Sequence, residues 1–101
     1  MRQMDPEYEK YNNSCGIKKG HEVQIIVREG TGKMASKKGA LLWENTSKEY
    51  GTMHAVIKAI YTALPEYRGK YLNIEVWNKT IDLKGEWRNH HVPLNRIPRQ
   101  L

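Results

Sequence analysis

The chain has 101 residues, of which 39% are hydrophobic, and its 17 Lys and Arg outnumber its 11 Asp and Glu to give a net charge of +6. This length allows one domain with one small core, and the charge favours nucleic acid or an acidic protein surface as a partner. The chain has no apolar stretch of the roughly 20 residues that cross a membrane, and its one cysteine, Cys15, cannot form an internal disulfide. We therefore expect a protein of a reducing compartment, the cytoplasm, without membrane contact.

The first elements are a polar arm and a strand. Residues 1–20 are polar and show no sustained periodicity, so we expect an N-terminal arm ahead of a small α/β domain at 21–89. From Glu22 onward, β-branched residues alternate with mostly polar ones in the sequence EVQIIVR. Alternation with period two and β-branched residues are typical of a strand that buries one face.

A basic loop and a second strand follow. Residues 30–39, GTGKMASKKG, contain three Gly and place the charges of Lys33, Lys37 and Lys38 close together in the sequence. The apolar residues ALLW at 40–43 predict a short strand, which would form an antiparallel hairpin with the first. The loop lacks the G-x-x-x-x-G-K-[ST] pattern of a P-loop. It therefore favours either contact with nucleic-acid backbone or a plain solvated turn.

One helix and a third strand complete the predicted domain. Apolar residues recur at helical spacing from Met53 to Leu64, with Thr52 as the predicted N-cap and Pro65 at the end. Residues 71–77, YLNIEVW, alternate so that Leu72, Ile74 and Val76 face the core while Tyr71, Asn73, Glu75 and Trp77 face away. Residues 79–87 would add a further hairpin arm, and 90–101 would be a basic C-terminal tail.

These elements predict an α/β (α+β) fold in the order strand-strand-helix-strand. The sheet would be a single layer of three or four strands, with one main helix packed on one face. Such a sheet has unpaired edges, and pairing across an edge would give a homodimer.

The candidate binding residues are cations and tryptophans. Nucleic-acid phosphates would contact the lysines of the loop and a second group of arginines, which are Lys33, Lys37, Lys38, Arg88, Arg96 and Arg99. Two tryptophans, Trp77 and Trp87, would bind a partner through exposed rings, whereas Trp43 is expected to be mostly buried. The four histidines and Cys15 show no metal-ligand spacing, so we expect no metal or other cofactor.

Several segments resemble ribonuclease H. MHAVIKAIYTAL at 53–64 is similar to the first helix of that family, whose E-[LI]-x-A-x-x-x-A-[LI] pattern is matched at Ala55, Ala59 and Ile60. EVQIIVREG and YLNIEVW resemble the first strand and the strand before the central Asp, and EWRNHHVP is loosely like a late strand. A more local likeness links VREGTGKMASKKGALL to macrolide-binding prolyl isomerases, although that family's intervening strands and Phe positions are missing here.

The resemblance implies a truncated ribonuclease H-like domain without its catalytic carboxylates. That family uses carboxylates to hold two metal ions, and the matching positions here carry Arg28, Thr52 and Asn78. These residues cannot supply the anionic charge that the metals need. The other carboxylates near predicted sheet and helix ends form no recognisable pair, so the sequence favours a non-catalytic protein over an enzyme.

Two functions remain open from the sequence. The first is a small, basic, non-catalytic nucleic-acid-binding module that contacts RNA, or a duplex containing RNA, through the lysine loop. The second is a protein-interaction module that acts as an inhibitor or adaptor of a larger nucleic-acid machine, of the kind that viruses and mobile elements encode. Loss of binding on neutralising the lysines would favour the first.

Overall fold

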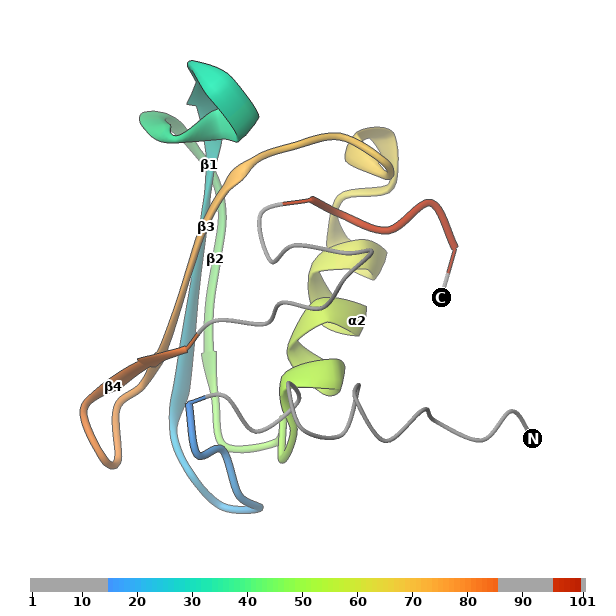
Figure 1. Ribbon diagram of the computed structural model, residues 1–101. Helices are drawn as coiled ribbons and strands as arrows, with labels where there is room; N and C mark the ends of the chain where they lie inside the picture. Colours follow the sequence, from blue (N-terminus) through green and yellow to red (C-terminus); the bar gives the residue numbers. More distant parts are fainter. Residues whose placement is uncertain (1–14, 86–95, 101) are drawn as a thin grey trace.

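The computed structural model describes residues 15–85 and 96–100, which form a four-stranded sheet with one main helix against one face (Figure 1). The strands, all antiparallel to their neighbours, lie in the order β2-β1-β3-β4. The elements in chain order are β1 (Val23–Thr31), η1 (Lys33–Ala35), β2 (Lys37–Ser47), α2 (Met53–Ala63), η2 (Pro65–Tyr67), β3 (Asn73–Asn78) and β4 (Leu83–Gly85). The predicted α+β class and the order strand-strand-helix-strand are confirmed.

Helix α2 links two strands that do not pair with each other. Both β2 and β3 run antiparallel to β1, which lies between them, so β2 and β3 are parallel to each other. The path from β2 to β3 passes through α2 on one side of the sheet (Figure 1). Within residues 15–85 and 96–100, α2, η2 and the segment 96–100 lie on this side (Figure 1). On the other side, η1 contacts only the end of the sheet, where Nδ2 of Asn73 donates to the carbonyl of Ala35 at 3.1 Å.

The core lies between α2 and the covered face of the sheet. The helix begins after Thr52, whose Oγ1 accepts a hydrogen bond of 3.1 Å from the amide of Ala55, as the N-cap prediction requires. Its buried residues are Met53, Val56, Ile57 and Ile60. They pack on the buried residues of β1 and β3, which are Val23, Ile25, Val27, Ile74 and Val76. Burying an aliphatic side chain of this size contributes roughly 1.5–3 kcal/mol, so this layer supplies most of the driving force for folding.

The hairpin between β1 and β2 differs from the predicted loop. The sequence predicts a loop at 30–39 and a short strand at 40–43, but β1 continues to Thr31 and β2 extends from Lys37 to Ser47. The register of the pair shifts after Val27 and again after Arg28. At Gly39 an added Cβ would lie 2.8 Å from the carbonyl oxygen of Glu29, so glycine permits the close approach there. Glycines that favour a loop in the sequence are here part of an irregular strand pair.

Residues on both sides of the predicted 21–89 domain contribute to the core. Cys15 and Ile17, from the predicted arm, and Ile97, from the predicted tail, are buried. The amide of Ile97 donates to the carbonyl of Lys70 at 3.1 Å, and the amide of Gly69 donates to the carbonyl of Ile97 at 2.7 Å. The described part of the tail is therefore docked on the connection between α2 and β3. No helix of the described residues is long and apolar enough to cross a membrane.

Replacing Gly85 with alanine is expected to destabilise the fold. An added Cβ would lie 2.6 Å from the Cβ and Sγ of Cys15 and 2.6 Å from the Cε of Met53. Overpacking of this kind costs roughly 1–3 kcal/mol, because the Cβ of Cys15 belongs to the packed core and cannot simply rotate away. Urea unfolding should show a lower midpoint with an unchanged slope. An unchanged midpoint would contradict the close packing of β4 on Cys15.

Candidate functional site

The face of the sheet away from α2 carries a group of polar, charged and aromatic side chains. Along β3, Glu75 and Trp77 alternate with the buried Ile74 and Val76, as the sequence predicts. Paired residues of neighbouring strands share a face, so Trp77 lies between Gln24 of β1 and Lys84 of β4. We call this surface the open face; its central residues are Arg28, Lys38, Glu75, Trp77 and Lys84.

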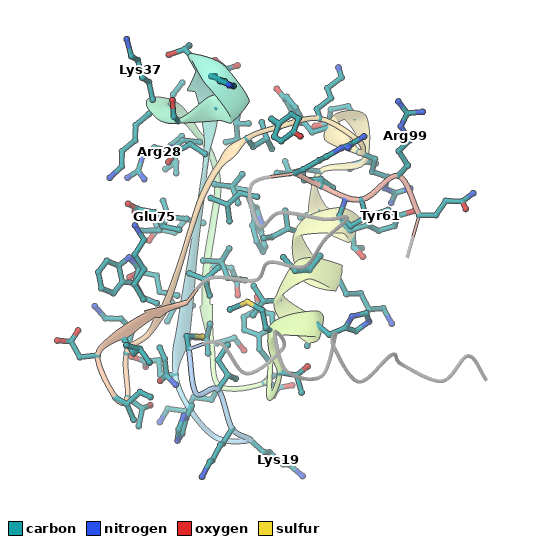
Figure 2. The ribbon with its side chains drawn as sticks, in the orientation of Figure 1. Lys19, Arg28, Lys37, Tyr61, Glu75 and Arg99 are labelled. Atoms are coloured by element: carbon teal, nitrogen blue, oxygen red, sulfur yellow. The ribbon has the colours of Figure 1, made fainter. Side chains whose placement is uncertain are left out.

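Glu75 lies at the centre of a ring of cations. Its carboxylate oxygens are 2.7 Å from Nζ of Lys38, 3.4 Å from an Nη of Arg28 and 3.8 Å from Nζ of Lys84. The Glu75 side chain is only 13% exposed, whereas those of Lys38 and Lys84 are 58% and 50% exposed. Figure 2 shows Arg28 and Glu75 on the side of the sheet away from α2. Three cations and one carboxylate leave the ring with an excess of positive charge.

The cations hold Glu75 in its ionised form. The hydrogen bond from Lys38 lowers the pKa of the Glu75 carboxyl, partial burial opposes that effect, and the charges of Lys38, Lys84 and Arg28 lower the pKa further. A carboxylate stabilised in this way is a poor proton acceptor. Glu75 is therefore better suited to orient the surrounding cations than to act as a general acid or base.

This pairing predicts a pH-dependent contribution to stability. Because the pKa of Glu75 is lower in the folded state than the ordinary 4.5, its ionised form stabilises the fold above pH 4.5. The contribution is lost as the pH falls from 4.5 through the lowered folded pKa. We expect Glu75→Gln to lose about 1 kcal/mol or less at pH 7, since two partners are half exposed. The difference from the wild type should shrink at pH 3 in urea unfolding, and a constant difference would contradict the pairing.

Trp77 provides an aromatic surface beside these cations. The ring is half-buried, and Nζ of Lys84 lies 5.9 Å from its centroid. On its other side, Gln24 Nε2 donates to Glu44 Oε1 at 3.2 Å. A tryptophan flanked by a cation and an amide can stack on a planar group and leave polar atoms available around it.

The structure divides the sequence-predicted cations among three places. Lys33 lies in η1 and Lys37 begins β2 at the end of the sheet near Arg28 (Figure 2), whereas Lys38 reaches the open face. The segment 96–100, which contains Arg96 and Arg99, lies on the helix side of the sheet (Figure 1). Arg88 and Trp87 fall outside the described residues. The candidates within the described residues thus do not form one surface, and of these only Lys38 and Trp77 lie on the open face.

Arg28 and Lys84 are binding candidates that the sequence interpretation missed. Arg28 follows the alternation of β1 and shares the outward face with Gln24 and Ile26. This alternation can be seen in the sequence, but it identifies Arg28 as a neighbour of Glu75 only when β3 is known to pair with β1. Lys84 could not be placed, because β4 is just three residues long.

The positions matched to ribonuclease H carboxylates do not lie together. Arg28 is on the open face and pairs with Asn73, whereas Asn78 is buried on the opposite face near the other end of β3. Thr52 caps α2. Among the described residues, no three His, Cys, Asp or Glu side chains are placed to share a metal ion. The resemblance to that family remains a prediction.

Asn78 is instead a structural residue. Its Nδ2 donates to the carbonyl of Cys15 at 3.2 Å and lies 2.9 Å from Nδ1 of His21. Its Oδ1 accepts from the amides of Thr80 at 3.1 Å and Ile81 at 3.4 Å. The amide therefore closes the turn after β3 and attaches the segment at Cys15 to the sheet.

Cys15 does not have the character of a nucleophile. Its side chain is fully buried, and this burial raises the pKa of the thiol to about 11. A thiol with such a pKa is neutral at physiological pH, and the thiolate is the reactive form.

Comparison of the chain with protein-family models, curated proteins and solved structures gave no match.

Proposed function

We propose that this protein is a small, non-catalytic nucleic-acid-binding module and that it binds single-stranded RNA on the open face. The observation that supports this most is the gathering of Arg28, Lys38 and Lys84 around Glu75, next to the ring of Trp77. Lys38 is the one residue of the predicted lysine loop that belongs to this contact. The net charge of +6 adds long-range attraction to a polyanion.

The two kinds of side chain would share the binding. Cations compensate phosphate charges and release counterions. An aromatic ring adds roughly 1–3 kcal/mol for each base that stacks on it, without strong sequence preference. Bases in a duplex are stacked on one another, whereas unpaired bases are free to lie on a ring of the protein. The half-buried Trp77 on the open face therefore favours a single strand.

Polar groups next to Trp77 favour RNA over DNA. Gln24 pairs with Trp77 across β1 and β3, and its amide is hydrogen-bonded to Glu44 on β2. A base stacked on Trp77 would bring its sugar near these groups. A ribose 2′-hydroxyl both donates and accepts hydrogen bonds, so it can bind amide and carboxylate groups that deoxyribose cannot.

The test is fluorescence anisotropy with labelled single-stranded RNA, single-stranded DNA, double-stranded RNA and RNA–DNA hybrid at two salt concentrations. We expect the tightest binding to single-stranded RNA, with affinity falling as salt rises. A Lys33→Gln/Lys37→Gln variant should bind almost as well as the wild type, because neither residue takes part in the ion-pair ring. Absence of binding to every ligand at low salt would refute the proposal.

Glu75→Gln is expected to tighten RNA binding. The substitution keeps the side-chain shape, removes the negative charge at the centre of the face and frees three cations that Glu75 now pairs. Removing one repulsive charge near a phosphate is worth about 1 kcal/mol at 4 Å in water, which is roughly fivefold in affinity. Anisotropy titrations of both proteins at low salt would measure this change. Weaker binding by the variant would contradict this and would show that Glu75 contacts the RNA directly.

An acidic protein surface is the second candidate partner. Leu41, which pairs with Arg28 on the open side of edge strand β2, is 55% exposed. An apolar side chain beside a cationic ring is typical of a protein-binding surface. In that case the module would act as an inhibitor or adaptor of a nucleic-acid machine. Protein capture that survives nuclease treatment, together with no RNA binding in the anisotropy test, would favour this function.

A further inference from the structure

A second group of cations lies on the helix side of the molecule. It comprises four cations with the tyrosines beside them, and we call it the C-terminal patch: Arg68, Lys70, Arg96, Arg99, Tyr61 and Tyr71. Figure 2 shows Tyr61 and Arg99 on the side of the sheet opposite to Arg28 and Glu75. Glu66 is the one acidic residue between positions 61 and 71, so this surface is strongly positive.

Backbone pairing brings the patch together from two distant segments. Gly69 and Lys70 exchange hydrogen bonds with Ile97, and Tyr71 forms a β-bridge with Arg96. The hydroxyl of Tyr61 donates to the carbonyl of Arg99 at 3.3 Å. These contacts fix residues 96–99 against the connection between α2 and β3.

The cations are held in place by aromatic rings and backbone. The guanidinium of Arg68 lies 3.8 Å from the centroid of the Tyr61 ring, and its Nε donates to the carbonyl of Tyr61 at 3.1 Å. The guanidinium of Arg96 lies 5.7 Å from the centroid of Tyr71. A guanidinium that stacks by its face keeps donors at its edge, and these match the oxygens of a phosphate.

The side chain of Arg99 packs against Gly69, the residue that follows Arg68 in the chain. An added Cβ at Gly69 would lie 2.8 Å from Cγ of Arg99, and Gly69 has φ of +81°, a conformation that favours glycine. The side chain of Arg99 thus passes over Gly69 while its carbonyl is bound to Tyr61. Among the described residues, no carboxylate forms an ion pair with Arg68, Lys70, Arg96 or Arg99, since the ion pairs found there all involve Glu75.

We infer that the C-terminal patch binds the phosphate backbone of a second nucleic-acid segment, so that one protein molecule bridges two segments. This inference rests on the proposed RNA binding by the open face. The sheet and α2 separate the two surfaces (Figure 2), so a short strand held on one face cannot contact the other. The patch matches a polyanion by charge, and its oriented guanidinium groups match phosphate in shape.

The test is energy transfer between two short single-stranded RNAs, one carrying a donor and one an acceptor dye. Strands of about five nucleotides are near the lower limit of known single-strand sites and keep each strand on one surface. We expect transfer to rise as wild-type protein is added up to stoichiometry. It should fall again in excess protein, because each strand then occupies a separate molecule. Light scattering would confirm that the protein is monomeric under these conditions.

Three variants separate the possible outcomes. Arg68→Gln/Arg99→Gln and Lys70→Gln/Arg96→Gln each remove two charges from the patch, and Lys18→Gln/Lys19→Gln removes two exposed charges elsewhere. The inference predicts that both patch variants lose at least half of the energy transfer yet retain anisotropy binding of a single strand, whereas the control keeps both. Single-strand binding without energy transfer in the wild type would overturn the inference and leave the proposed function standing. Transfer that persists in both patch variants would overturn it too, and no binding at all would refute both proposals.

Discussion

Replacing Arg28, Lys38 and Lys84 with glutamine is expected to weaken the binding of single-stranded RNA on the order of 100-fold at 0.1 M salt. Each phosphate contact with a single strand contributes about 0.7 to the slope of log K against log salt. Three lost contacts therefore remove about two from that slope, which corresponds to roughly two decades of affinity at 0.1 M relative to 1 M. Anisotropy titrations over a salt series would measure both quantities.

The matched control is Lys18→Gln/Lys19→Gln/Lys48→Gln. These lysines are exposed and lie before β1 or in the connection after β2, so the control removes the same charge without changing the open face. We expect the control to bind RNA less than about tenfold more weakly than the wild type, because it loses only long-range attraction. Equal losses in the two variants would show that binding depends on net charge and not on this surface.

Asn78→Asp is expected to lose roughly 3 kcal/mol of folding stability. The Nδ2 group donates toward the carbonyl of Cys15 and toward His21 Nδ1, and an aspartate would present an acceptor to both. A buried donor or acceptor left without a partner costs about 1–3 kcal/mol. For a domain of this size, the melting temperature should fall by more than about 10 °C, as measured by circular dichroism.

Asn45→Asp is the matched control for this substitution. The Oδ1 of Asn45 accepts from the hydroxyl of Tyr50 at 2.7 Å on an exposed part of β2, and aspartate can still accept that bond. We expect a change within about 0.5 kcal/mol. An Asn78→Asp protein that is fully stable and gains Mg²⁺-dependent RNA cleavage would contradict the structural role of Asn78 and support a degenerate ribonuclease H site.

Local sequence patterns predicted most of the secondary structure. Alternation in EVQIIVR and YLNIEVW identified β1 and β3 and the side of the sheet that each residue faces. The helix followed from its apolar spacing, and both its N-cap and its end at Pro65 agree with the structure. The length of β2 could not be predicted, because its first residues, KKG, are typical of turns and are held in the strand only by pairing with β1.

The candidate site depends on which residues of neighbouring strands pair with each other. Local sequence patterns do not indicate this register. Glu75 meets Arg28 and Lys84 because β3 pairs with both β1 and β4, and Lys38 reaches Glu75 from β2 on the far side of β1. These residues are far apart in the chain, and each alone is typical of a solvated strand position. The C-terminal patch was hidden for the same reason, since residue 97 reaches Lys70 through tertiary packing that no local periodicity indicates.

The central claim is that RNA binds on the open face with Trp77 in the contact. It is tested most directly by proton–nitrogen correlation spectra of the labelled protein during titration with a short single-stranded RNA, with the Trp77 indole signal assigned from a Trp77→Phe variant. We predict a large shift of that indole signal together with the amides around Trp77, Lys84 and Arg28, and little change in the amides of α2 residues such as Ile57. A titration that shifts other signals while the Trp77 indole stays in place would contradict the account.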